Sequence, residues 1–307
     1  MSNSHMPIGG FGKLPCYGDY LKVNVSQPTA RAIQDLMLHA KQELAVSDDG
    51  SGEGGYRDVA IESRLRILLG LSGSKELFVG VLWPSRDSGG RHFPFVVFTY
   101  LTRRAYGRNY ALLPLALAPV WEALDDTWDS LAEATTREDF KERLETTELP
   151  HLAEIKDARG EYQGRMREDV GRIFEGSSGA SPVHLAGNVP GLLKELRGGA
   201  GVSVQLPVSG DLAEACFDVS VWIDMVNRQF RLKRFEPNVF LDERPGVSGR
   251  WVVLRFGDTR PYDYLEIVGR PAGGEFMRPA HSTDGSGEED PSSSKEMTYE
   301  DLLAVRY

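Results

Sequence analysis

Apolar residues recur at steps of three and four in two long segments, which predicts two amphipathic helices. The first begins after Ser26, which can cap a helix, and Pro28, which is tolerated in a first turn. The second carries two tryptophans, which we assign to the core. The apolar faces are Ile33, Leu36, Met37, Ala40 and Leu44 in the first helix, and Leu113, Leu117, Val120, Trp121, Leu124, Trp128 and Leu131 in the second.

Three shorter helices are predicted from weaker signals. Thr135 with Glu138 has the spacing of a capping box and opens one of them. The other two are amphipathic segments, Arg64 to Leu71, which runs into a turn at Gly73, and Val189 to Leu196.

Strands are predicted from β-rich runs and from period-two alternation. The strictest alternation runs from Phe217 to Met225, and with a turn at Asn227-Arg228 it predicts a hairpin whose second strand is Gln229 to Phe235. Two β-rich runs also flank the loop from Pro84 to His92. Further strands are expected at Val202 to Leu206, Trp251 to Phe256 and Tyr264 to Val268.

Helices combined with antiparallel hairpins, without a steady βαβ alternation, predict the α/β class. We expect a mixed β-sheet with strong antiparallel content, layered by helices, in a single large domain over residues 7–270. Residues 271–307 are rich in Ser, Gly and Glu and low in apolar residues, so we expect a mostly disordered tail with a short docking helix near its end. The acidic, glycine-rich stretch from Ser47 to Gly55 is expected to be a mobile loop.

The charge balance excludes some classes of partner. With 35 Lys and Arg against 45 Asp and Glu, the formal net charge is −10, which opposes nucleic acid and anionic membrane as bulk partners. Arginines still gather locally at Arg103, Arg104 and Arg108. No apolar run reaches the roughly 20 residues of a membrane span. With only Cys16 and Cys216 and no secretion signal, we expect a soluble, cytoplasmic protein.

Patterns typical of catalysis or metal binding are scarce. None of the six histidines lies within a few residues of another His or a Cys, so we expect no metal site and no cofactor. A thiol hydrolase would require Cys16 to meet a base such as His92 in space, and no family-like spacing supports it. Three carboxylates on the long helix are interpreted as its solvated face: Asp125, Asp126 and Asp129.

The remaining polar candidates lie in two glycine-bearing loops, residues 8–20 and 84–92. The first lacks the Gly and the Ser or Thr of a phosphate-binding Walker loop, because Pro7 and Leu14 stand at those positions. Arg91 can fork onto Asp87 or Asp19 and lock the two loops together, or the loops can present a partner-binding surface. We predict that the candidates converge at one end of the sheet: Gly12, Lys13, Asp19, Ser85, Asp87 and Arg91.

These two loops resemble the TagF family, also called ImpM, of bacterial type VI secretion accessory proteins. The motifs cover about the first hundred residues, and the later half matches only loosely, through a segment with Trp222. The matching motifs are Gly10 to Pro15 (GFGKLP), Gly18 to Tyr20 (GDY), Gly80 to Ser85 (GVLWPS), Asp87, and Gly90 to Phe95 (GRHFPF).

The resemblance implies a cytoplasmic protein that is not an enzyme and that represses type VI secretion after translation through protein–protein interaction. In some systems such proteins engage a forkhead-associated scaffold protein. The family has no catalytic residues to transfer, so the loop candidates rest on the sequence reasoning alone. Two alternatives stay open: a hydrolase using Cys16 and His92, and a small-ligand sensor using the two loops.

Overall fold

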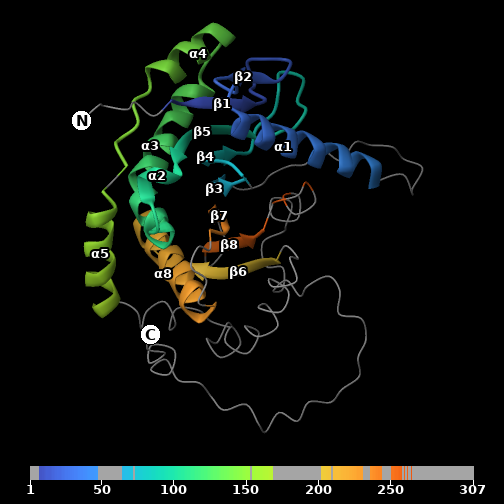
Figure 1. Ribbon diagram of the computed structural model, residues 1–307. Helices are drawn as coiled ribbons and strands as arrows, with labels where there is room; N and C mark the ends of the chain where they lie inside the picture. Colours follow the sequence, from blue (N-terminus) through green and yellow to red (C-terminus); the bar gives the residue numbers. More distant parts are fainter. Residues whose placement is uncertain are drawn as a thin grey trace, which may run out of the picture.

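An eight-stranded antiparallel sheet organises the described part of the chain (Figure 1). The computed structural model describes residues 7–47, 64–71, 73–152, 154–168, 202–208, 210–230, 236–243, 250–257, 259, 261 and 264. The strands are β1 (Gly9–Gly12), β2 (Leu21–Val23), β3 (Arg64–Gly70), β4 (Glu76–Trp83), β5 (Phe95–Thr102), β6 (Val202–Val208), β7 (Asn238–Glu243) and β8 (Arg250–Phe256).

The strand order is β2-β1-β5-β4-β3-β7-β8-β6, and all seven neighbouring pairs are antiparallel. The predicted α/β class is confirmed, and its antiparallel content extends to every pair of these strands. The central β4–β5 hairpin pairs Glu76 with Thr102 at one end and Trp83 with Phe95 at the other. The loop from Pro84 to Pro94 therefore projects from one end of the sheet.

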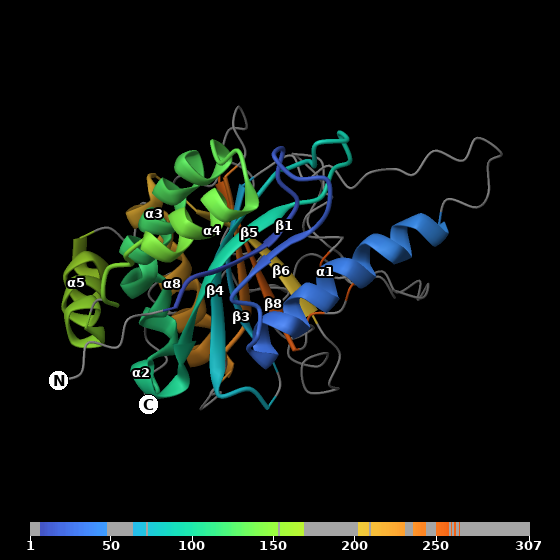
Figure 2. The same ribbon diagram turned by 90° about the horizontal axis from the view of Figure 1, so that it is seen from above.

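Helices cover both faces of the sheet, with α1 on one side and α3, α4, α5 and α8 on the other (Figure 2). None of the helices in the described ranges is both long and apolar enough to span a bilayer. Their bounds are α1 (Pro28–Ser47), α2 (Arg103–Tyr106), the 3-10 helix η1 (Tyr110–Leu112), α3 (Leu113–Ala132), α4 (Arg137–Thr146), α5 (Ile155–Glu168) and α8 (Leu212–Phe230).

Two apolar cores follow from this layering. Along β4, Val79 and Val81 face the layer of α3 and α8, whereas Phe78 and Leu82 face α1. A strand buried on both faces reads as a continuous apolar run, which is why β4 and β5 were recognisable from the sequence. The predicted helices at α1, α3 and α4 and the predicted strands at β6 and β8 are confirmed as well.

The predicted helix over Arg64 to Leu71 is wrong, because this segment is strand β3. Leu65 and Ile67 pack on the α1 side while Leu68 packs on the other side. Because both faces of the strand are buried, apolar residues also fall three and four positions apart by chance. Eight residues are too few to distinguish the helical period of about 3.6 from the strand period of 2. The turn at Gly73 is present, with a left-handed φ of 76°.

The predicted hairpin over Phe217 to Phe235 is also wrong, since residues 212–230 form the helix α8. Phe217, Val219 and Val221 do alternate with polar residues, but the intervening Asp218 and Ser220 are both 0% exposed. Residues 215–223 are all buried, so the polar residues among them do not mark a solvent-facing side. The local alternation of apolar and polar residues was therefore mistaken for a strand with one exposed face.

Asp125 on α3 is likewise not part of a solvated face. Its carboxylate binds Arg66 of β3, and its Oδ1 lies 3.2 Å from the terminal nitrogen of Arg64. The Arg66 side chain is only 4% exposed, so it requires a nearby carboxylate. This ion-pair group joins α3 to the sheet.

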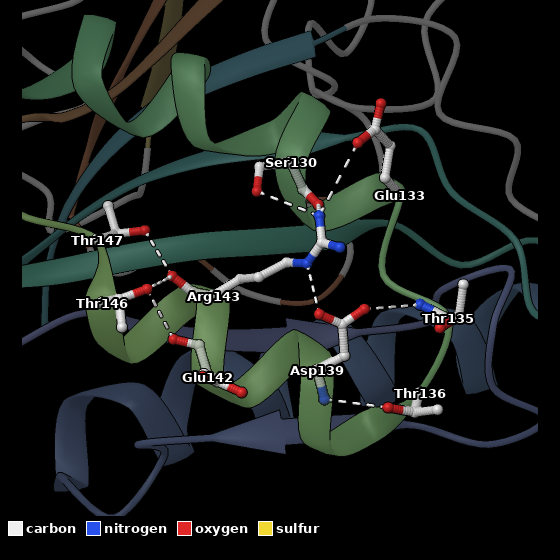
Figure 3. Close-up of polar contacts among 9 residues, drawn as sticks. All are labelled: Ser130, Glu133, Thr135, Thr136, Asp139, Glu142, Arg143, Thr146 and Thr147. Carbon is white, nitrogen blue, oxygen red and sulfur yellow. Dashed lines mark hydrogen bonds and ion pairs between the residues drawn. The ribbon is translucent and has the colours of Figure 1, made fainter.

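The start of α4 is capped one residue later than predicted (Figure 3). Thr136 Oγ1 accepts a hydrogen bond from the Asp139 backbone N–H at 3.1 Å, and Asp139 Oδ2 accepts one from Thr135 N–H at 3.1 Å. Arg143 holds the same carboxylate through Nε at 2.6 Å and donates to the Ser130 carbonyl at the end of α3 at 2.8 Å. A threonine and an acidic residue three positions later thus cap the helix as predicted, but the pair is Thr136 and Asp139 instead of Thr135 and Glu138.

Asn238 joins the last three strands to the first five. Its Oδ1 accepts the Gly70 N–H at the end of β3 at 2.7 Å, and its Nδ2 donates to Thr259 Oγ1 at 2.8 Å. Nearby, the buried Tyr110 hydroxyl donates to the Pro237 carbonyl at 2.5 Å.

Tyr264, the one described residue of the predicted strand at 264–268, is helical, so the prediction is wrong at that position. Several other expectations lie outside the described residues: the helix at 189–196, most of the loop at 47–55, residues 231–235, residues 265–268, and the tail.

We predict that Asn238→Ala lowers the free energy of unfolding by about 1–3 kcal/mol, because the buried Gly70 N–H loses its acceptor. Asn238→Asp keeps an acceptor oxygen and should lose less. Denaturant unfolding of both variants measures the difference, and equal losses would contradict the role given to the Asn238 oxygen.

Candidate functional site

Asp87 lies at the centre of a polar cluster that joins the two glycine-bearing loops. Its side chain is 0% exposed. Oδ2 accepts hydrogen bonds from Lys13 Nζ and Arg91 Nε, both at 2.7 Å. Oδ1 accepts the backbone N–H groups of Gly89 at 3.0 Å and of Arg91 at 2.9 Å. Four donors therefore surround one buried carboxylate.

These donors decide the ionisation of Asp87. Burial on its own raises the pKa of this carboxyl, but the hydrogen bonds from Lys13 and from the Arg91 amide and guanidinium outweigh that effect. The pKa of Asp87 is held well below its usual range. The carboxylate is therefore charged at neutral pH and bound to two cations.

Lys13 is the buried partner, with a side chain 4% exposed. Its Nζ also lies 5.3 Å from the centre of the Tyr20 ring, a cation–π distance. Its carbonyl oxygen accepts a hydrogen bond from Ser85 Oγ at 2.6 Å. Both the side chain and the backbone of Lys13 thus contact residues of the other loop.

Gly12 allows the two loops to approach this closely. Its φ is 141°, a region that favours glycine, and a Cβ placed there would lie 2.2 Å from the Pro94 carbonyl oxygen. The same Cβ would lie 2.6 Å from Phe95 Cα. Because both atoms belong to the backbone, no side-chain rotation can make room. Gly12 therefore has a structural role.

Arg91 closes the cluster from the solvent side. Its NH2 group donates to the Gly18 carbonyl at 2.7 Å, and the neighbouring Ser88 N–H donates to the Tyr17 carbonyl at 3.2 Å. The Arg91 side chain nevertheless stays 62% exposed. Its second terminal nitrogen makes no hydrogen bond within the described ranges. The polar cluster of Lys13, Ser85, Asp87 and Arg91, which we call the lock, therefore leaves a fixed cationic group at the surface.

The structure brings four of the six predicted residues into direct contact, namely Lys13, Ser85, Asp87 and Arg91, with Gly12 beneath them. Asp19 differs. It is exposed, and its Oδ1 accepts the Tyr20 N–H at 2.7 Å. Arg91 therefore forks onto Asp87 and a backbone carbonyl, and the alternative fork onto Asp19 is not observed.

An aromatic cluster beside the lock was not predicted. Phe11 stacks on Tyr20 at a centroid distance of 5.8 Å, and Phe93 contacts both rings edge-on at 5.7 and 4.9 Å. Lys22 lies over Phe11 and Lys41 over Phe93, at 5.9 and 5.7 Å. Phe11, Tyr20 and Phe93 each belong to a different one of the family motifs, and that coincidence was the one signal available in the sequence.

The electrostatic surroundings of Cys16 give little support to a thiol hydrolase. Burial raises the pKa of the Cys16 thiol, its own backbone hydrogen bond opposes that rise, and the Asp139 carboxylate adds to it. A catalytic thiol needs the opposite, a lowered pKa supplied by a cation or a paired histidine. In the described ranges no three His, Cys, Asp or Glu side chains are grouped to hold a metal ion.

Residues 9–147 match a family model described as the TagF N-terminal domain, type VI secretion system-associated. This stretch is a TagF N-terminal domain. The match contains all six predicted loop residues and the capped start of α4. The description of this family associates the matched domain with the type VI secretion system.

One solved structure similar to the chain is the crystal structure of PA0076 from Pseudomonas aeruginosa PAO1, with 21% sequence identity and a TM-score of 0.36. The similarity covers 48% of this chain and 64% of that one, so the chain spans a little under two thirds of its length. A comparison with curated proteins found no match.

We predict unequal losses of stability when the two cations that bind Asp87, Lys13 and Arg91, are removed one at a time. Lys13→Met leaves a buried carboxylate without its buried counter-charge and should cost about 3–5 kcal/mol. Arg91→Ala removes a largely exposed cation while Lys13 and two backbone donors remain, so it should cost about 1 kcal/mol or less. Denaturant unfolding measures both. Similar losses in the two variants would mean that the charge of Lys13 has no special weight.

A second prediction concerns pH. Because the pKa of Asp87 is lower in the folded chain than in the unfolded chain, its contribution is complete above the unfolded value of about 3.9 and is lost as the pH falls further. The free-energy gap between the wild type and Asp87→Asn should be constant near neutral pH and should shrink in acid. The comparison cancels the other carboxylates, and a gap that widens in acid would refute this assignment.

Proposed function

We propose that this protein is a cytoplasmic regulator, without enzymatic activity, that represses type VI secretion after translation by binding a protein of the secretion apparatus. The TagF N-terminal domain supports the pathway. The finer proposal is that the protein is a repressor acting through protein contacts. It rests on the properties of the surface formed by residues 8–20 and 84–92, which we call the two-loop surface.

The observation that carries the proposal is the exposure of Arg91 within an otherwise buried lock. A cation whose Nε and one terminal nitrogen are already bound has lost most of its side-chain freedom before a partner arrives. It also keeps 62% of its side chain exposed. Arginines of this kind, rigid and partly desolvated, are frequent energetic centres of protein interfaces.

Exposed neighbours extend this surface. Arg86 and His92 form an isolated antiparallel bridge across the same loop, and both are exposed. Asp19 is an exposed carboxylate that follows Gly18, whose carbonyl binds Arg91, so the surface presents both signs of charge to a partner. A forkhead-associated scaffold protein is one candidate partner, and the small-ligand sensor remains an alternative use of the same loops.

We predict that Arg91→Ala relieves repression of type VI secretion in cells while soluble abundance and melting temperature stay close to wild type. The reason is that the variant removes the fixed surface cation and leaves Asp87 bound to Lys13. Arg137→Ala is the matched control, since Arg137 is an exposed arginine of α4. Secretion, abundance and co-purification of a tagged forkhead-associated scaffold are measured for each.

Full repression by a folded Arg91→Ala protein would eliminate the two-loop surface as the partner site. The enzyme alternative is tested in the same assay by Cys16→Ser, which should leave repression unchanged because a regulator needs no thiolate. Loss of repression by a folded Cys16→Ser protein would overturn the proposal that the protein is not an enzyme.

A further inference from the structure

Three arginines fall within six residues after β5, and only the first has a carboxylate partner in the described part of the chain. Arg103 forms an ion pair with Glu236 and donates from Nε to the Ser74 carbonyl at 2.9 Å. Arg104 and Arg108 are exposed, and neither side chain forms a hydrogen bond or ion pair with another described residue. Arg103 therefore holds the turn in place, while the other two cations face solvent.

A third uncompensated guanidinium comes from α5. Arg159 is exposed and donates to the side-chain oxygen of Asn109, whose own Nδ2 donates to the Tyr106 carbonyl at 3.1 Å. The acceptor is a neutral amide, so the contact positions Arg159 without cancelling its charge. Arg159 is thereby tied to the same turn that carries Arg104 and Arg108.

The turn itself leaves the arginines accessible. Gly107 has a left-handed φ of 59°, and a Cβ placed there would meet no atom within 4 Å. The intervening Ala105 is also exposed and small. No bulky side chain of the turn therefore shields Arg104 or Arg108 from an approaching ligand.

We propose that Arg104, Arg108 and Arg159 form an arginine surface that binds an acidic segment of a protein partner. Each guanidinium retains donors in the planar fork that fits a carboxylate. A net charge of −10 repels an extended polyanion such as nucleic acid or an anionic bilayer. A short acidic segment responds instead to the charges within one Debye length, about 8 Å at physiological salt.

This arginine surface is distinct from the two-loop surface around Asp87. The β4–β5 hairpin has the Asp87 loop at one end and α2 directly after its other end. Eight residues of extended strand separate the two ends by about 25 Å. The binding of an acidic segment is therefore separable from the role proposed for Arg91.

The test uses the full chain and fluorescein-labelled hexaglutamate as the probe, with binding followed by fluorescence anisotropy. The double variant Arg104→Glu/Arg108→Glu should bind at least about tenfold more weakly than wild type, as expected when two charge contacts are reversed. Arg137→Glu/Lys141→Glu on α4 changes the net charge equally and should bind within about twofold of wild type. Wild-type affinity should also fall between about 50 and 200 mM salt.

Arg91→Ala is included and should bind hexaglutamate like wild type, so failure of the two-loop proposal and failure of this one give different results. Equal weakening by the Arg104→Glu/Arg108→Glu and Arg137→Glu/Lys141→Glu variants would overturn the arginine surface, since the loss of binding would then reflect net charge alone. Binding to phosphatidylserine vesicles without binding to hexaglutamate would overturn the assignment to an acidic polypeptide. Far-UV circular dichroism establishes that each variant is folded.

Discussion

The buried carboxylate of Asp87 is the constraint on which two features of this site depend, the contact between the two loops and the position of the exposed Arg91. A charge removed from water must be matched by donors. The chain supplies them through Lys13, which follows β1, and through Gly89 and Arg91 of the loop that carries Asp87. Close approach of the loops, permitted by Gly12, is a consequence of this requirement. The position of Arg91 at the surface follows in turn.

The sequence correctly predicted the elements that bury few polar residues. The helix α3 has an apolar and a polar face, and β4 has no polar side chain after Glu76. The errors fall on β3 and α8, where polar residues are buried with the apolar ones. Arg66 and Asp218 are 3% and 0% exposed, and such positions mislead any reading that equates polar with exposed.

The candidate site was predictable as a set but not as a geometry. Complementary charges in two glycine-bearing loops indicated that they would meet, and Lys13, Ser85, Asp87 and Arg91 do so. The sequence could not choose between Asp87 and Asp19 as the partner of Arg91. That choice depends on Asp87 being buried and Asp19 being exposed, which only the folded backbone determines.

The pairing of β3 with β7 has a consequence for the boundaries of a TagF N-terminal domain. The family match ends at residue 147, yet the β3 edge is completed by β7, and α8 packs beside α3 on the same core. A fragment cut at that boundary would present the backbone N–H and C=O groups of residues 64–68 as an open sheet edge. In this chain β7 closes that edge, so the segment after residue 147 contributes a strand to the sheet that the N-terminal stretch begins.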